Sequence, residues 1–268
     1  MDVRGKIVVV TGAAQGIGLA LVERFVRAGA RKVVAADVNG QKVEAAAHLA
    51  GAAGYACDVA NAEDVAALVE LVEARFGPID LFCSNAGVFE PDIDPDNCAA
   101  AADELWNRSW SINVLGHVHA ARALLPRMIA RGGGYFLNTV SAAGVLNQIG
   151  SAIYGTTKHA AIGFAENLAF THQHQGIKVS VLCSQAVDTA MLRAGGDRPS
   201  SASLDGVLTA EQVAEAALAG IAKETFLILP HPEVATYRAR KASDYDRWIT
   251  GMNRLLGILR VKAREGLR

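Results

Sequence analysis

Short runs of consecutive apolar residues alternate with longer amphipathic stretches along most of the chain. The β-branched run at 6–11 has no alternation of polar and apolar positions, which is typical of a strand buried on both faces of a parallel sheet. The longer stretches repeat apolar residues every three or four positions, as amphipathic helices do. Because the two patterns alternate without a long linker, the sequence predicts a single doubly wound α/β domain over residues 1–268.

The same pattern predicts the positions of the elements. Strands are expected at 6–11, 32–37, 54–57, 79–84, 133–139, 177–183 and 225–229. Helices are expected at 16–29, 40–50, 62–76, 102–131, 152–174 and 210–222.

Three segments depart from this alternation. Residues 88–98 are rich in proline and aspartate and are expected to form a loop at the carboxyl edge of the sheet. Residues 190–208 contain many glycines and serines; we predict a lid over the substrate, with an ordinary surface loop as the alternative. Residues 231–268 form a predicted C-terminal helical extension beyond the last strand.

Large or apolar residues recur in this extension at a spacing of three or four. They stand at 234, 237, 241, 245, 248, 252, 255 and 259. The spacing predicts one helix that packs on the domain or on a neighbouring subunit. There are two alternatives. Tyr237 or Trp248 could reach the substrate pocket, or the face of the extension that carries its basic residues could lie on a membrane surface.

Composition narrows the class of protein. The chain has 268 residues, of which 51% are apolar, enough to bury a sheet on both faces. Its net charge of −1 gives no general attraction to nucleic acid or to an anionic membrane. The first predicted strand starts too early to leave room for a signal peptide, and no apolar run is long enough to span a bilayer. We therefore expect a cytoplasmic protein with no membrane or nucleic-acid partner.

Cysteine and histidine spacing does not suggest a metal site. Cys57, Cys83, Cys98 and Cys183 have neither paired nor metal-ligand spacing. Three of them fall near the ends of predicted buried strands, which favours reduced core thiols. The seven histidines form no zinc-like pair with a carboxylate, so no metal is predicted.

A glycine-rich turn follows the first strand directly and leads into a helix. Backbone N–H groups and the helix dipole at such a junction attract phosphate. The spacing G-x3-G-x-G differs from the commoner G-x-G-x-x-G, and an ordinary strand–helix turn is the alternative. The residues expected to bind a dinucleotide here are Gly12, Gln15, Gly16, Ile17 and Gly18.

Carboxylates end the second and third predicted strands. Asp37, nineteen residues beyond Gly18, can accept both hydroxyls of an adenosine ribose and would repel a 2′-phosphate, which indicates NAD rather than NADP. Neither Val38 nor Asn39 supplies a compensating positive charge. Asp58 could accept the adenine amino group or could cap the following helix, and both interpretations stay open.

Small residues follow the fourth predicted strand. Asn85, Ala86 and Gly87 would leave room beside the adenine ring and its ribose.

The strongest chemical signal is a tyrosine and a lysine one helical turn apart. Tyr154 and Lys158 share a helix face, and Ser141 lies thirteen residues before the tyrosine, at the end of a predicted strand. A nearby ammonium favours phenolate, so we expect the cation to lower the tyrosine pKa and make it a proton acceptor or donor. Tyr237 and Lys241 repeat the spacing, but Glu224 stands where the serine would be.

These motifs together resemble the short-chain dehydrogenase/reductase superfamily in its single-domain form, from about residue 5 to about residue 190. Their order along the chain is Thr11-Gly12-x3-Gly16-Ile17-Gly18, Asp58-Val59, Asn85-Ala86-Gly87, Asn113, Ser141, Tyr154 and Lys158. The resemblance implies a Rossmann-type sheet of seven parallel strands and a dimer or tetramer.

The resemblance also implies roles for individual residues. Tyr154 would be the general acid/base, Ser141 would hold the substrate oxygen, and Lys158 would lower the tyrosine pKa and grip the nicotinamide ribose. Asn113 would hold a water in a proton relay to the lysine. Thr11 would brace the glycine turn, and Val59, Val187 and Thr189 would contact the cofactor.

One segment departs from the family pattern. The family usually has Pro-Gly after the sixth strand, where this chain has Gln185-Ala186. The departure affects the expected path of the loop that closes over the nicotinamide. It does not touch the proton-transfer residues.

The sequence thus predicts an NAD(H)-dependent oxidoreductase that interconverts a secondary alcohol and a ketone. Its partner would be a small-molecule alcohol or ketone, and the enzyme would be a homo-oligomer. A nucleotide-binding regulatory or scaffold protein without significant turnover is the alternative.

Overall fold

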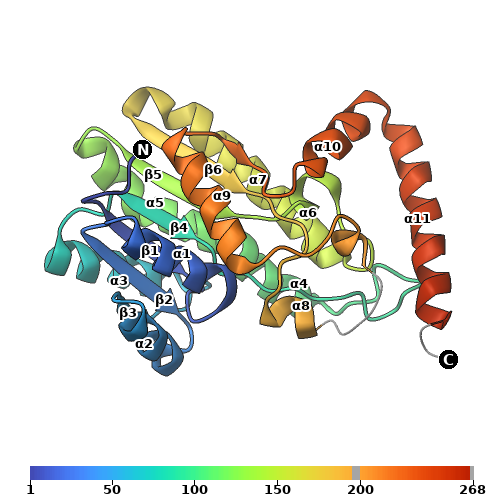
Figure 1. Ribbon diagram of the computed structural model, residues 1–268, viewed down its shortest axis with the longest axis horizontal. Helices are drawn as coiled ribbons and strands as arrows, with labels where there is room; N and C mark the ends of the chain where they lie inside the picture. The colour runs from blue at the N-terminus through green and yellow to red at the C-terminus, as the bar shows by residue number, and fades with distance from the viewer. Residues whose placement is uncertain (195–199, 266–268) are drawn as a thin grey trace.

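The centre of the molecule is a parallel sheet of seven strands (Figure 1). The computed structural model describes residues 1–194 and 200–265. The strands are β1 (Ile7–Thr11), β2 (Lys32–Asp37), β3 (Ala53–Ala56), β4 (Leu81–Ser84), β5 (Gly134–Thr139), β6 (Ile177–Leu182) and β7 (Leu227–Ile228). They lie in the order β3-β2-β1-β4-β5-β6-β7. Strands β2 and β3 extend the sheet on one side of β1, and β4 to β7 extend it on the other, so the strand order reverses between β1 and β4. In doubly wound sheets, ligands bind beyond the carboxyl ends of the strands at such a reversal.

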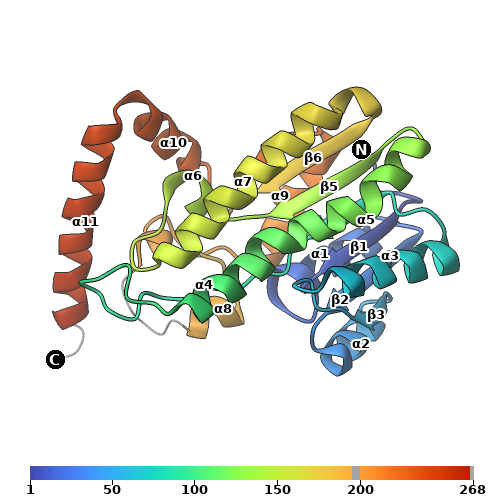
Figure 2. The ribbon, with the colours of Figure 1, turned by 180° about the vertical axis from the view of Figure 1, so that it is seen from behind.

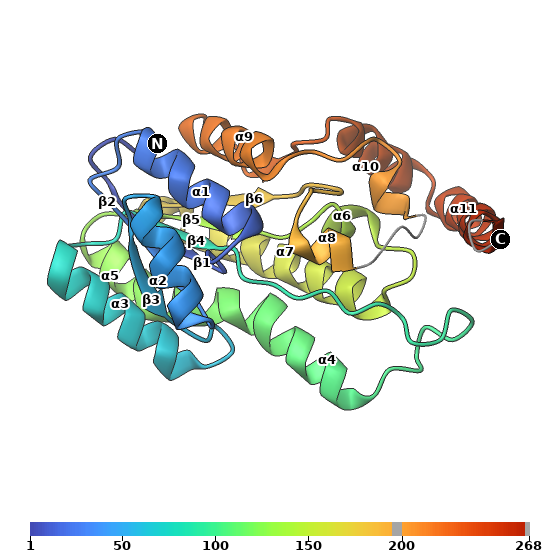
Figure 3. The same cartoon turned by 60° about the horizontal axis from the view of Figure 1, so that its bottom comes forward.

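Helices cover both faces of the sheet (Figure 3). In the body they are α1 (Gly16–Arg27), α2 (Gly40–Leu49), α3 (Ala62–Phe76), α4 (Asp103–Trp110), η1 (Ser111–Leu115), α5 (Gly116–Ala130), α6 (Ala143–Leu146), α7 (Ala152–His172), η2 (Gln173–Gln175), α8 (Ala190–Ala194), η3 (Ser201–Ser203) and α9 (Ala210–Ala222). Helices α1, α2 and α9 pack on one face, and α3, α5 and α7 pack on the other. The predicted doubly wound fold is confirmed.

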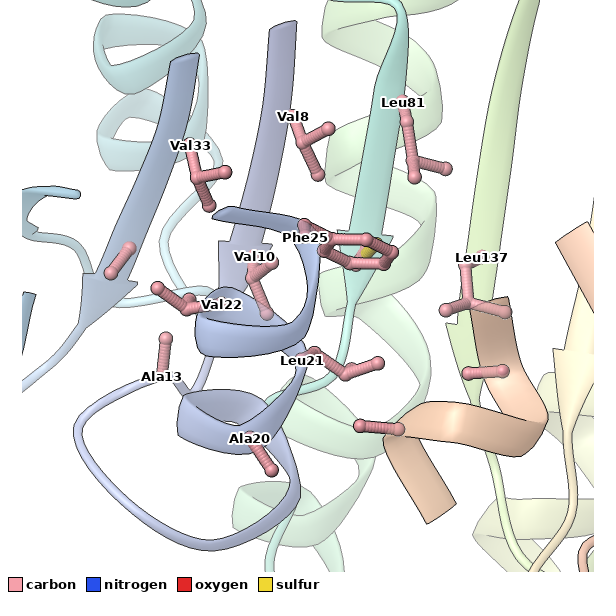
Figure 4. Close-up of a cluster of buried hydrophobic side chains, with 14 of the residues drawn as sticks. Val8, Val10, Ala13, Ala20, Leu21, Val22, Phe25, Val33, Leu81 and Leu137 are labelled. Carbon is pink, nitrogen blue, oxygen red and sulfur yellow. The ribbon is translucent and has the colours of Figure 1, made fainter. Parts of the chain in front are cut away.

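Each face of the sheet carries its own apolar core. Figure 4 shows Leu21, Val22 and Phe25 of α1 between that helix and strands β1 and β4. Alternate residues of one strand divide between the two cores: Val8 belongs to this one, and Val9 to the core beneath α3 and α5. Both valines are fully buried, which explains why β1 has no polar alternation.

The predicted helix at 102–131 is three elements rather than one. A π-helical turn, η1, separates α4 from α5 and carries Asn113 in its middle. The buried Asn113 amide donates to Val88 and Thr157, so its side chain is held by two segments outside the helix. Single π turns inserted in α-helices are frequent at functional sites.

The C-terminal extension is two helices, so the prediction of one continuous helix is wrong. Helices α10 (Glu233–Ser243) and α11 (Tyr245–Glu265) meet at Asp244, whose backbone is extended. The Asp244 carboxylate accepts the Arg247 N–H at 3.0 Å, as a helix N-cap does. The cap at Asp244 ends α10 and begins α11, although large side chains keep their spacing of three or four residues across it.

Helix α11 stands at one end of the molecule, away from the sheet (Figures 1 and 2). Arg260 joins it to the 88–98 loop through an ion pair with Asp96 at 2.9 Å and a hydrogen bond to the Pro95 carbonyl. Within 1–194 and 200–265, no helix combines the length and apolarity needed to cross a bilayer.

Candidate active site

The glycine-rich turn between β1 and α1 is packed too closely to admit side chains. Gly12 has a φ of +63°, which favours glycine, and a Cβ there would lie 2.6 Å from Ala86 Cα. A Cβ on Gly18 would lie 2.2 Å from the Gly12 carbonyl oxygen. The turn therefore presents bare backbone at the N-terminus of α1, the arrangement that binds pyrophosphate.

Residues after β4 brace this turn. Asn85 Nδ2 donates to the carbonyl oxygens of Thr11 at 3.0 Å and Gly12 at 3.2 Å. The Thr11 hydroxyl in turn accepts the backbone N–H groups of Asn85 at 3.0 Å and Ala86 at 3.3 Å. The small residues after β4 are thus bonded directly to the glycine turn.

Replacing Gly18 with alanine is expected to destabilise the protein by about 2 kcal/mol, because its Cβ would overlap the Gly12 carbonyl. Gly163, in α7, has open space where a methyl group would stand, with nothing within 4 Å. Gly163→Ala should therefore stabilise the protein by about 0.5–1 kcal/mol through helix propensity. Chemical denaturation of both variants measures the difference; equal stabilities would contradict the packing argument.

Asp37 lies at the end of β2, beside the glycine turn. One carboxylate oxygen accepts the Ala14 N–H and the other accepts the Asn39 N–H, both at 3.1 Å. Each oxygen keeps a further lone pair for a ligand hydroxyl. Lys42 lies nearby and donates to the Gln15 side chain, a contact that sequence reasoning missed because it joins α2 to the turn.

Asp58 does not cap the helix that follows it. The N-cap of α3 is Asn61, whose side chain accepts the Glu63 N–H at 2.9 Å. Asp58 instead accepts the Ala60 N–H at 2.9 Å in a local turn. The capping interpretation of Asp58 is therefore wrong, while its role toward an adenine stays a prediction. Val59, the next residue, is buried.

Tyr154 and Lys158 lie one turn apart near the start of α7. Ser151 caps this helix by accepting the Tyr154 N–H at 3.2 Å. Lys158 Nζ lies 5.4 Å from the centre of the Tyr154 ring, and Phe89 meets that ring edge-on at 5.1 Å. Ser141, just after β5, lies beside the phenol; its hydroxyl donates to the Ser184 carbonyl at 3.4 Å and accepts the Ala143 N–H at 3.1 Å.

Burial dominates the pKa values of this group. It raises the pKa of Tyr154 above its ordinary value, while the hydrogen bond from Ser141 acts in the opposite direction. The sequence predicts that the Tyr154 pKa is lowered, whereas in this structure burial raises it. Burial lowers the pKa of Lys158 to about 8. The lysine is thus poised to exchange a proton near neutral pH.

Asn113, Gly87 and Lys158 meet at one point. A Cβ on Gly87 would lie 3.2 Å from Asn113 Oδ1 and 3.3 Å from Lys158 Nζ. Asn113 Oδ1 also accepts the Val88 N–H at 2.9 Å, which leaves one lone pair free for another donor. A side chain at residue 87 would thus crowd both the amide oxygen and the ammonium group.

The region between β4, β5 and α5 is polar but uncharged. Ser84 and Asn138 are directly paired across the two strands, and His117 of α5 lies beside Asn138. Among the described residues, the Ser84 hydroxyl, both His117 ring nitrogens and Asn138 Nδ2 have no well-formed hydrogen bond. Burial, with a smaller contribution from the Lys158 charge, lowers the pKa of His117 to about 3. Sequence reasoning gave His117 no role, and nothing local in the chain marks it.

The loop after β6 is held by Gln185 at the position where the family has proline. The Gln185 N–H donates to His231 Nδ1 at 3.2 Å, and its Nε2 donates to Asp205 at 2.9 Å. Proline has neither donor, so the departure replaces a rigid turn with two hydrogen bonds. His231 and Asp205 were not singled out from sequence, because they lie on segments far along the chain.

Val187 and Thr189 lie further along the same loop. Val187 is buried and forms a bridge with Leu208, and the Thr189 methyl group lies 3.2 Å from where a Cβ on Gly16 would stand. The loop thus returns to the glycine turn. Residues 200–208 of the predicted lid pack against it, and residues 195–199 lie outside the described residues.

Comparison with known proteins identifies relatives over most of the chain. A family model described as short chain dehydrogenase matches residues 6–199. The chain is 35% identical over 254 residues to 1-deoxy-11-beta-hydroxypentalenate dehydrogenase of Streptomyces exfoliatus, covering 92% of this chain and 90% of that protein. It is 37% identical over 199 residues to 2,5-dichloro-2,5-cyclohexadiene-1,4-diol dehydrogenase of Sphingobium indicum, covering 73% and 78%.

A solved structure shares the fold. The crystal structure of a short chain dehydrogenase/reductase from Burkholderia phymatum in complex with NAD matches with a TM-score of 0.81 at 27% identity. The match covers 92% of this chain and 96% of that one.

Proposed function

The chain belongs to the short-chain dehydrogenase/reductase superfamily and is an oxidoreductase of CH–OH groups, and from that premise we propose that it uses NAD(H) to interconvert a secondary alcohol and a ketone, with Tyr154 as general acid/base. The observation that carries this proposal is the meeting of Tyr154, Ser141 and Lys158, with Lys158 Nζ next to Gly87, which follows the residues that brace the glycine turn. Because these residues are intact and adjacent, a scaffold protein without turnover is not favoured.

The site offers groups suited to each part of a dinucleotide. In this proposal the bare turn at Gly12, Gln15, Gly16, Ile17 and Gly18 holds the pyrophosphate, and Asp37 holds the adenosine ribose. Asp58, Val59, Asn85, Ala86 and Gly87 surround the adenine side, and Val187 and Thr189 the nicotinamide side. When bound, the dinucleotide supplies the hydride acceptor or donor.

Proton transfer rests on the chain's own residues. In oxidation, the Tyr154 phenolate accepts the hydroxyl proton of the alcohol while the Ser141 hydroxyl hydrogen-bonds the substrate oxygen. The ammonium of Lys158 stabilises the phenolate against the cost of burial. Asn113 Oδ1 and Lys158 Nζ both lie next to Gly87, which supports a water that they share and that relays the proton from the lysine.

The pH dependence of the two directions should be opposite. Oxidation needs Tyr154 as phenolate, so kcat/KM for the alcohol is expected to rise with pH through the apparent pKa of the coupled Tyr154–Lys158 pair. Reduction needs the phenol, so kcat/KM for the ketone is expected to fall over the same range. Lys158→Met should move the oxidation limb to higher pH, because the phenolate loses its cation. Parallel profiles in the two directions would contradict the assignment.

We propose an apolar ring alcohol as the substrate class. The segment that follows Ser141 is apolar: Ala142 and Leu146 are buried in a cluster with Val145 and Trp248, and Phe89 meets the tyrosine ring edge-on. The relatives named above act, by their names, on a hydroxypentalenate and a cyclohexadiene-diol. A screen of hydroxysteroid, alicyclic, polyol and fatty hydroxy substrates with NAD would test this; preference for polyols would oppose it.

The cytoplasmic location and the dimer or tetramer remain part of the proposal. Exposed apolar side chains on α11, among them Ile249, Ile258 and Val261, support an assembly that covers them. Light scattering of the purified chain measures its oligomeric state.

A further inference from the structure

Helix α10 repeats the spacing of the catalytic pair without its serine. Tyr237 and Lys241 lie one turn apart on this helix, and both side chains turn toward the body of the enzyme rather than to solvent. Lys241 is 8% exposed, which is unusual for a lysine that pairs with no carboxylate within the described residues. Their contacts explain why these two residue types stand there.

Tyr237 holds the segment that follows η3. Its hydroxyl donates to one carboxylate oxygen of Asp205 at 2.8 Å, while Gln185 Nε2 donates to the other at 2.9 Å. Asp205 thereby joins three separate parts of the chain: α10, the 200–208 segment and the loop after β6. Hydrogen bonds to a carboxylate are roughly twice as strong as those between neutral groups.

The 200–208 segment and the loop after β6 are also joined through their backbones. Leu208 N–H donates to the Ala186 carbonyl at 3.1 Å, and Asp188 N–H donates to the Leu208 carbonyl at 2.8 Å. The loop continues directly to Thr189, which lies against the glycine turn. Asp205 is therefore linked to the loop that reaches the glycine turn.

Lys241 is bonded to α6 and α7. Its ammonium donates to the Val145 carbonyl in α6 at 2.9 Å and lies 3.2 Å from His159 Nε2 in α7. His159 Nδ1 lies 2.8 Å from the Gly155 carbonyl, so Nδ1 carries the proton and Nε2 accepts from the lysine. His159 directly follows Lys158. One turn of α10 is thus bonded to the helix that carries the acid/base pair.

We propose that α10 is a clamp, in which Tyr237 and Lys241 are positioning residues that fix the loop after β6 relative to α6 and α7. The inference rests on the proposed function, because it places the substrate beside Ser141, next to the loop after β6 and to α6. One turn before Tyr237, the fully buried Val234 packs with Ala142 and Leu146. The clamp sets the shape of the substrate site and leaves the proton-transfer groups untouched.

Three single variants test the clamp. Tyr237→Phe and Lys241→Met should each raise KM for the alcohol about tenfold, as expected for loss of a hydrogen bond to a charged group. The dissociation constant of NAD and kcat at saturating alcohol should each stay within about twofold. Tyr245→Phe is the matched control: this tyrosine is 58% exposed on the same extension, and the variant keeps the ring that lies 5.5 Å from the Lys241 ammonium and removes only a hydroxyl, so it should leave all three values unchanged.

Hydrogen exchange supplies a readout that does not depend on turnover. Tyr237→Phe should speed exchange of the Leu208 and Asp188 amides, and Lys241→Met that of the Val145 and Leu146 amides, each about tenfold and with little effect on the other pair. Thermal unfolding checks that each variant is folded.

The outcomes separate the two proposals. Unchanged KM with unchanged exchange would overturn the clamp, as would equal changes in KM, kcat and the NAD dissociation constant. If the unaltered chain oxidised no alcohol, the proposed function would fail, and the exchange experiment would still decide whether α10 fixes the 200–208 segment and α6.

Discussion

Replacing Tyr154 with phenylalanine is expected to lower kcat by about 10³-fold, because the variant loses the group that exchanges a proton with the substrate oxygen. The ring and its edge-on contact with Phe89 at 5.1 Å are kept, so the fold and the cleft should be preserved. The dissociation constant of NAD should change by less than about twofold, since general acid–base catalysis acts in the transition state. Steady-state rates and fluorescence titration with the dinucleotide measure the two quantities.

Tyr245→Phe provides a control for removal of a phenol hydroxyl elsewhere. Tyr245 lies on α11 and is 58% exposed, so its variant should retain full kcat. Undiminished turnover in Tyr154→Phe would eliminate the mechanism. Loss of turnover together with loss of NAD binding would indicate a disturbed site rather than a missing proton donor.

Replacing Asp37 with serine is expected to change the preference between NAD and NADP by about 10³-fold. Loss of hydrogen bonds from the ribose hydroxyls to a carboxylate should weaken NAD use by about tenfold to a hundredfold. Removal of a negative charge next to a 2′-phosphate should improve NADP use, because like charges in contact cost several kcal/mol. The measured quantity is the ratio of kcat/KM for the two dinucleotides.

Asp37 also accepts the N–H groups of Ala14 and Asn39, so its replacement could loosen the glycine turn. Unfolding of the variant without cofactor measures that effect separately. Asp103→Ser, in the first turn of α4, is the control and should leave the ratio unchanged. A ratio unchanged in Asp37→Ser would mean that this carboxylate does not choose between the cofactors.

Strand positions were predictable because a strand buried on both faces has a local signature. The run predicted at 6–11 is β1 to within one residue. Asp37 and the glycine turn, which come at the ends of β2 and β1, lie at the carboxyl edge of the sheet, as parallel topology requires. The helix with Tyr154 and Lys158 was equally predictable from its period. These features depend on neighbours along the chain.

Features that depend on distant segments were missed. The π turn at Asn113 is stabilised by Val88 and Thr157, which lie 25 and 44 residues away. The bond between Asp205 and Tyr237 joins residues 32 apart, and no local pattern signals it. Two outcomes were local: the capping alternative for Asp58 fails because Asn61 caps α3, and the Asp244 cap was missed because the spacing of large side chains continues past it.

The brace that Asn85 places on Thr11 and Gly12 bears on how a dinucleotide associates. Those hydrogen bonds come from the protein itself, so the curvature of the turn is already present before any ligand arrives. The turn at Thr11 and Gly12 therefore loses little backbone entropy when a dinucleotide binds. More of the interaction energy between the turn and the dinucleotide then contributes to the binding affinity. Association should accordingly follow a single concentration-dependent phase, without a slow ordering step.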